Sequence, residues 1–317
     1  MPPVGFGIGD LIGDGSLTPL GNNLVDGLSN GVVWALIALG YTLVYAVVEL
    51  INIAHGDVFM IGSFVSFGLY ATLGLSTASA GAGLVLGLVA ALLVAMVACA
   101  SLSVMIERVA YRPLRDRPRL ASLVASVGFS FILQNVGELW VGPRQVPRSV
   151  PDLIDANHEL VSISGVSITN GHVVAIATAA PLIVLVSAFA RRSRIGRAMR
   201  ATAQDPQAAR LMGINVDTTI SVTFLVAGLL AGAAGLVHAL ANTTIHYAQG
   251  FQAGLIAFTA AAIGGLGNLY GAVAGAVAIG CIQQLADSRI GGEWTSAVVF
   301  AYLVVVLVCR PEGLAGR

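Results

Sequence analysis

The feature that most constrains the fold is a long stretch without charge: residues 218–286 contain no aspartate, glutamate, lysine or arginine. One helical crossing of a bilayer needs about 17–25 apolar residues, so this stretch is long enough for more than one. A soluble domain carries roughly 25% charged residues to wet its surface, whereas this chain carries 10%, with 56% hydrophobic residues. The composition therefore predicts an all-α, polytopic transmembrane helical bundle whose outer surface contacts lipid.

Apolar runs of crossing length recur along the chain. The last long run is interrupted by glycines at 264, 265, 267 and 271, so we expect it to divide into two short helices, giving nine spans. Eight spans with a re-entrant loop are the alternative. We expect one membrane domain over residues 24–317, preceded by an external glycine-rich segment, residues 1–23. The apolar runs lie at 24–48, 57–74, 83–106, 120–140, 172–190, 220–241, 253–286 and 295–309.

The placement of arginine orients these spans. All 16 basic residues are arginine, and 11 of them lie in the segments 107–119 and 191–217. Basic segments are retained in the cytoplasm, so we expect both segments, and the C-terminus, on the inner side. Residues 1–23 contain two aspartates and no arginine, which predicts an external N-terminus.

The absence of lysine excludes one class of function. A Walker-type phosphate loop needs a lysine to reach the β- and γ-phosphates of a nucleotide, and Schiff-base catalysis needs one as well. The formal net charge is zero, which argues against a nucleic-acid partner. The three cysteines (Cys99, Cys281 and Cys309) are scattered through apolar runs, so we interpret them as packing residues. We expect no enzyme, no metal and no cofactor in this chain.

A polar break separates the first two apolar runs. Between Glu49 and Asp57 the chain places Asn52, His55 and Gly56, and no arginine. Ionisable groups at membrane depth are costly and generally face a cavity or the bundle interior, so these residues are candidates for a substrate pathway or an inner gate. A helix cap in a simple cytoplasmic turn is the alternative. His55 and Asp57 are too few for a metal site.

The sequence around this break has a weak internal repeat. Residues 43–46 (LVYA) and 236–239 (LVHA) each precede a polar segment that ends in glycine, Gly56 in the first case and Gly250 in the second. On the expected topology the two helices run in opposite directions, as in the inverted repeats of transporters.

The segment 191–219 is the larger arginine-rich loop. Residues 197–203 are good helix formers, and Asp205 followed by Pro206 suits the N-cap and first position of another short helix. Gly213 is placed to end that helix. Either this is a linker lying on the inner headgroups or it is a lever that fits a soluble motor subunit.

The external segment 141–171 is either a solvated loop or surface helix, or a docking surface for an external partner.

Several motifs together resemble the membrane permease subunit of ATP-binding-cassette importers for branched-chain amino acids, the high-affinity leucine/isoleucine/valine type. They occur in the order of that family, and the resemblance runs from about residue 24 to 316. The motifs are residues 35–45 (ALIALGYTLVY), 51–57 (INIAHGD), 106–114 (IERVAYRPL), 133–135 (LQN), 194–200 (RIGRAMR), 211–215 (LMGIN), 257–261 (AFTAA) and 264–267 (GGLG).

The resemblance implies an assembly in a bacterial plasma membrane. Two permease subunits, a paralogous pair, would combine with two ATPase subunits that bind ATP and Mg²⁺ inside, and with a substrate-binding protein outside. The glycines Gly264, Gly265 and Gly267 would supply a second break beside the pathway. The helix that docks on the ATPase would include Ala203, Gln204, Asp205, Leu211, Gly213 and Ile214.

Two other functions remain open from the sequence. A permease of the same architecture could carry urea or short amides, because selectivity in such systems rests largely on the external binding protein. A stand-alone secondary transporter or channel would need coupling residues within its spans. Only Asp26 and Glu138 qualify, and both lie near span ends.

Overall fold

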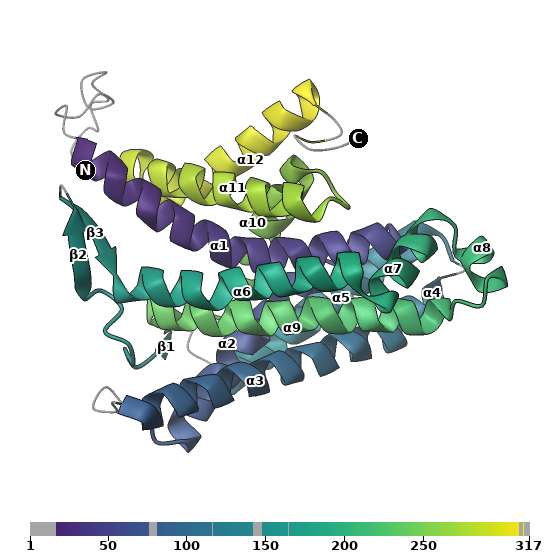
Figure 1. The fold of residues 1–317 in the computed structure, drawn as a ribbon, viewed down its shortest axis with the longest axis horizontal. Helices are drawn as coiled ribbons and strands as arrows, with labels where there is room; N and C mark the ends of the chain where they lie inside the picture. Colours follow the sequence, from purple (N-terminus) through teal and green to yellow (C-terminus); the bar gives the residue numbers. More distant parts are fainter. Residues whose placement is uncertain are drawn as a thin grey trace.

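The computed structural model describes residues 17–75, 81–115, 117–141, 148–163, 165–310 and 313, and these are almost entirely helical (Figure 1). The longer helices are α1 (Leu17–Val48), α2 (Ala54–Thr72), α3 (Gly81–Ile106), α5 (Arg119–Val141), α6 (Asn170–Arg192), α9 (Val216–Asn242), α10 (Gln249–Gly264), α11 (Leu269–Ile290) and α12 (Gly292–Cys309). The all-α class predicted from composition is confirmed.

Six helical segments of the described residues are long and apolar enough to cross a membrane: Pro19–Val48, Gly81–Leu114, Arg119–Trp140, Asn170–Arg192, Val216–Asn242 and Leu269–Ile290. This number is lower than the eight or nine spans expected from the apolar runs. The helices α2, α10 and α12 occupy the remaining runs. α2 and α10 are largely buried among the others, and each lines the interior with polar residues or glycines.

The apolar run 253–286 divides into two helices, as expected. α10 ends at Gly264 and α11 begins at Leu269, with Gly265 (φ +95°) and Gly267 (φ +93°) in the turn. Backbone with such φ values is accessible to glycine and strained for other residues. The side chain of Asn268 then caps α11 by accepting hydrogen bonds from the N–H groups of Tyr270 and Gly271 (3.1 and 3.2 Å).

The first arginine-rich segment is more helical than the expected loop, 107–119. α3 continues through a π-helical turn (Glu107–Tyr111) into α4 (Arg112–Leu114). Pro113 has no N–H group for the carbonyl four residues earlier. The π turn lies immediately before it, and such turns are rare within helices and frequent at functional sites. Apolar periodicity alone does not reveal this continuation.

Over the part that the structure describes, the segment 141–171 is a loop that carries a β-hairpin and not a surface helix. β2 (Glu159–Ile163) pairs with β3 (Val166–Thr169) as an antiparallel hairpin, and β1 (Arg148–Ser149) pairs with β4 (Thr244–Ile245). β2 is exposed along its length and rich in β-branched residues. Residues 142–147 of the segment, which include Arg144, lie outside the described residues.

The first helix begins earlier than expected. α1 starts at Leu17, so residues 17–23 of the expected external segment belong to this helix, and residues 1–16 lie outside the described part. The early turns pack on the β2–β3 hairpin, where Ser167 N–H donates to the side-chain oxygen of Asn22 (2.9 Å). The C-terminal residues 311, 312 and 314–317 also lie outside the described residues.

The two ends of the bundle differ (Figure 1). The start of α1 and the β2–β3 hairpin lie at one end, whereas α4, α7 (Arg194–Gln204) and α8 (Pro206–Leu211) lie at the other. The second end carries both arginine-rich segments, as the span pattern predicts.

The weak internal repeat in the sequence corresponds to a repeat in the structure. α1 and α9 run in opposite directions (Figure 1), and α1 packs on α11 as α9 packs on α3. Each of the two helices ends at a residue in the left-handed region, Glu49 (φ +52°) and Thr243 (φ +50°). Six residues later, His55 N–H donates to the Asn52 carbonyl, and Gln249 N–H donates to the His246 carbonyl, both at 3.1 Å. The units α1–α3 and α9–α11 are therefore inverted copies of one arrangement.

Candidate functional site

The break between α1 and α2 lies inside the bundle. Asn52, His55 and Asp57 expose 2%, 1% and 0% of their surfaces. The N-cap residue of α2 is Ile53, and no side chain caps this helix end. The alternative of a capped turn at the surface therefore does not describe these residues.

Several polar atoms of this cluster have no partner among the described residues: Oδ1 of Asn52, Nε2 of His55 and Oδ1 of Asp57. An unpaired polar atom in an apolar interior is costly. Irregular polar backbone at membrane depth is tolerated where it lines a pathway or is buried in protein. Two of these atoms face glycines of neighbouring helices: Nε2 of His55 faces Gly40, and Oδ1 of Asp57 faces Gly250.

Asp57 is held by α5. The hydroxyl of Ser130 donates to Oδ2 of Asp57. Gln134, one helical turn further along α5, donates from Nε2 to the Ser130 hydroxyl (3.0 Å). The motif at 133–135 therefore contributes Gln134 to the support of the buried carboxylate, which the sequence did not indicate.

Two glycines bring the break between α1 and α2 into contact with the break between α9 and α10. A Cβ atom on Gly250 would lie 2.7 Å from Oδ1 of Asp57 and 2.9 Å from the carbonyl oxygen of Gly56. A Cβ atom on Gly56 would in turn lie 2.6 Å from Cα of Gly254. Small residues permit such close helix approach in membranes. The partner of the first break is therefore the start of α10.

His55 is enclosed by α1. Its ring stands edge-on to the ring of Tyr41, with centroids 4.8 Å apart. A Cβ atom on Gly40 would lie 2.7 Å from Cε1 of the His55 ring. The histidine thus occupies space that only a glycine at position 40 leaves open.

The second predicted pathway set lies elsewhere. Gly264, Gly265 and Gly267 form the α10–α11 turn, where Gly264 packs on the backbone of Gly271, Gly265 on Gly313, and Gly267 approaches Ala46. The structure brings Asn52, His55, Gly56 and Asp57 together, and it places these three glycines at the opposite end of α10 from Gly250. The sequence signal for the break between α9 and α10 was the weak internal repeat that ends in Gly250.

The predicted docking segment forms the two short helices α7 and α8. Asp205 ends α7 and caps α8, where its Oδ1 accepts hydrogen bonds from the N–H groups of Gln207 (2.8 Å) and Ala208 (3.0 Å). Gly213 (φ +82°) donates to the Arg210 carbonyl and Ile214 to the Ala209 carbonyl, both at 3.0 Å. This pair of bonds is the Schellman motif, so the cap and stop predicted from the sequence are confirmed.

The docking segment exposes apolar side chains at the tip of the bundle. Leu211 and Met212 are 88% and 83% exposed, next to the polar residues Gln204 and Asp205, which are also exposed. Ala203 and Ile214 are half-buried at its base. An exposed apolar pair beside polar and arginine residues fits both alternatives, a contact with the inner headgroups and a contact with a soluble subunit.

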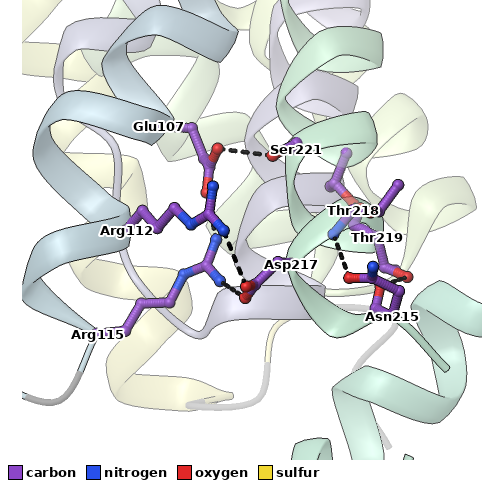
Figure 2. Close-up of polar contacts among 9 residues, drawn as sticks. Glu107, Arg112, Arg115, Asn215, Asp217, Thr218, Thr219 and Ser221 are labelled. Carbon is purple, nitrogen blue, oxygen red and sulfur yellow. Dashed lines mark hydrogen bonds and ion pairs between the residues drawn. The ribbon is translucent and has the colours of Figure 1, made fainter. Parts of the chain in front are cut away.

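An ion-pair cluster lies near this segment, between the end of α3 and the start of α9 (Figure 2). The guanidinium of Arg115 bridges the carboxylates of Glu107 and Asp217, and Arg112 adds a second contact to Asp217 (3.2 Å). Ser221 donates to the other oxygen of the fully buried Glu107 (2.7 Å). The cluster joins the π turn and α4 to the first turns of α9, immediately after α8.

Among the described residues, no group of three or more histidine, cysteine, aspartate or glutamate side chains could hold a metal ion.

Antiparallel broken helices around a buried polar cluster, together with several helices of membrane-crossing length, define a multi-pass membrane transport protein. The chain belongs to the family described as branched-chain amino acid transport system / permease component, which it matches over residues 23–307. No solved structure gives a significant match.

The chain is similar to several permease proteins over nearly its whole length. It is 38% identical to the high-affinity branched-chain amino acid transport system permease protein LivH of Escherichia coli strain K12, over 93% of this chain and 94% of that protein. It is 36% identical to BraD, the permease protein of the same kind of system in Pseudomonas aeruginosa, over 93% and 95%. A more distant match, the autoinducer 2 import system permease protein LsrC of Klebsiella pneumoniae, is 28% identical over 60% of this chain and 55% of that protein.

Proposed function

We propose that this chain is the transmembrane permease subunit of an ATP-binding-cassette importer that moves branched-chain amino acids delivered by an external binding protein. The observation that carries the proposal is end-to-end similarity to LivH and BraD, whose names state that substrate class. The similarity covers both the buried break and the exposed α7–α8 hairpin.

The energy for transport comes from other subunits in this proposal. The chain has no lysine for a Walker-type loop, so ATP and Mg²⁺ bind to two partner ATPase subunits. The apolar tip at Leu211 and Met212, with Asp205 and Gln204 beside it, supports docking on such a subunit. A second permease subunit, a paralogue of this one, completes the membrane part.

We infer nine spans, with the N-terminus outside and the C-terminus in the cytoplasm. The helices α2, α10 and α12 then cross with the six long ones. The end of the bundle that carries α4, α7 and α8 faces the cytoplasm because it holds the arginine-rich segments. An odd number of spans agrees with termini on opposite sides.

Transport follows from rocking of the two inverted units about their breaks. Movement of α8 on the ATPase is transmitted through α7 and the start of α9 to the contact between Gly56 and Gly250. Asn52, His55 and Asp57 line the pathway there, and the α10–α11 turn, with Gly264, Gly265 and Gly267, flexes as α10 moves. A solute shifts such an equilibrium only through its different affinities for the two states.

Uptake in proteoliposomes tests the proposal. We expect labelled leucine to enter only when this chain is reconstituted with its permease partner, ATPase subunits, loaded binding protein and ATP. Uptake of urea in place of leucine would move the chain to the short-amide permeases. Uptake by this chain alone, without ATP, would show a stand-alone transporter or channel and overturn the proposal.

A further inference from the structure

A second polar region lies on the outer side of the buried break. A cavity of about 330 Å³ opens between α1, α9, α10 and α11, which is the lower end of the range of small-molecule sites, about 300–1,000 Å³. Six of its lining residues carry neutral side-chain amides: Asn30, Asn242, Gln249, Gln252, Gln283 and Gln284. We call this cavity the amide chamber.

The chamber is built by regular helix faces. Asn30 and Trp34 are one turn apart on α1, and Gln249, Gln252 and Ile256 follow the spacing of one face of α10. Four helices thus present amides to one space. In a bundle in which polar side chains are few, such convergence suits a polar occupant.

One amide donor in the chamber is unsatisfied. The side-chain oxygen of Gln249 accepts a hydrogen bond from the N–H of His246 (3.0 Å), which fixes the side chain. Its nitrogen, Nε2, is buried and has no partner among the described residues. A buried donor without a partner costs stability, and this one belongs to a residue that lines the chamber.

The chemistry of the lining matches a zwitterion. Each amide offers both donors and an acceptor, so the same set can bind a carboxylate and an ammonium group. Asp287, the acidic member of the described lining, adds a partner for the ammonium group. Trp34, whose indole N–H donates to Gln283 (2.9 Å), and Ile256 supply apolar surface for an aliphatic side chain.

The chamber lies near the predicted pathway. Trp34 contacts His238 and Phe59, with ring centroids 6.0 and 6.5 Å apart. Seven residues further along the same face of α1, about 10 Å, Tyr41 contacts His55. The chamber therefore lies about two helical turns from the buried break, on the side away from α7 and α8.

We propose that the amide chamber is the site where the permease binds the neutral amino acid before it reaches the break, with the zwitterionic head on the amides and Asp287 and the aliphatic side chain on Trp34 and Ile256. This assignment rests on the proposed function and adds the position and the chemistry of recognition. Gln249 donates to the carboxylate in this arrangement.

Chemical protection tests the site directly in the assembled complex. Gln252→Cys is treated with a water-soluble methanethiosulfonate, and its modification is followed by mass spectrometry of the peptide. We expect millimolar leucine to slow the modification at least about threefold. Isocaproate, which lacks the ammonium group, and isopentylamine, which lacks the carboxylate, should protect little, because each loses half of the polar contacts.

Asn135→Cys on α5, an exposed amide position away from the chamber, is the matched control and should show no leucine effect. Equal protection of Gln252→Cys by all three solutes, or no protection by leucine, would overturn the assignment.

Transport gives a second test: Gln249→Leu should lower leucine uptake about tenfold, whereas Asn135→Leu should leave it unchanged. Normal uptake by assembled Gln249→Leu complex contradicts the site, while absence of uptake by the unaltered complex contradicts the proposed function instead.

Discussion

At the scale of single residues, the contact between the two breaks depends on glycine at positions 56 and 250, because a Cβ atom at either position would collide with the neighbouring helix. Gly250 lies so close to Asp57 and Gly56 that a methyl group has no room. Asp57 itself is fully buried and is bonded on one oxygen by Ser130. Together these residues hold the two irregular backbone segments in close contact.

Replacing Gly250 by alanine should separate the breaks. The new Cβ atom would overlap the Asp57 side chain and the Gly56 carbonyl, so we expect a loss of about 1–3 kcal/mol in the free energy of unfolding and a lower midpoint in a thermal unfolding assay of the purified complex. Gly83→Ala on α3 is the matched control, because nothing lies within 4 Å of its Cβ position. Equal midpoints for the two variants would contradict the contact.

Replacing Asp57 by alanine should impair transport more than assembly. The variant removes the buried carboxylate and leaves Ser130 without its acceptor, so we expect leucine uptake to fall about tenfold or more. Glu138→Ala, near the exposed end of α5, serves as the comparison carboxylate. Uptake by Asp57→Ala vesicles at the unaltered rate would remove Asp57 from the pathway.

At the scale of elements, α8 is defined by its two ends. Asp205 satisfies two N–H groups at its start, and the Schellman bonds satisfy two carbonyls at its finish. A helix of six residues has little stability of its own. Its shape therefore depends on these caps.

Removing the N-cap of α8 should loosen the docking segment. Asp205→Ala loses both accepted hydrogen bonds, which costs about 1 kcal/mol. We expect faster hydrogen exchange at the amides of Gln207 and Ala208 and weaker binding of the ATPase subunit. Asp205→Asn, which caps a helix about as well, should behave like the unaltered chain. Indistinguishable exchange in all three chains would show that the cap is not what orders α8.

The ion-pair cluster at the start of α9 should matter more than a surface pair. Glu107 is fully buried between Arg115 and Ser221, so Glu107→Ala leaves charged and polar groups uncompensated. We expect a loss of about 3 kcal/mol, visible in thermal unfolding of the complex. Arg119→Gln breaks an exposed pair with Glu49, for which about 0–1 kcal/mol is typical. A smaller effect at Glu107 than at Arg119 would contradict the buried network.

Element ends with local signals could be predicted from the sequence, and elements set by distant contacts could not. The Asp205-Pro206 pair and Gly213 bound α8 as expected, because caps depend on adjacent residues. The helical path through Leu114 depends on bonds from Arg115 to Asp217, far away in the sequence, and β1 exists because it pairs with β4. Nothing local to residues 107–119 or 148–149 encodes those partners.

At the scale of the whole molecule, the fold is two inverted units joined through their breaks. The sequence predicted the membrane class from its charge deficit and one buried cluster from the polar break at Asn52, His55 and Asp57. It indicated the break between α9 and α10 only through the short internal repeat before Gly250. Glycine motifs at 264–267 were the more conspicuous signal, but they serve the turn between α10 and α11. Which apolar segments meet in space is not contained in their composition.

The central claim is that transport is driven from the cytoplasm through the exposed α7–α8 hairpin. Its most direct test is the side from which Leu211→Cys can be labelled by a membrane-impermeant maleimide, followed on the peptide that contains it. The account predicts no labelling in intact cells, rapid labelling in inside-out vesicles stripped of the ATPase, and protection when the ATPase is restored. Labelling of Leu211→Cys in intact cells would place the hairpin outside and contradict the account.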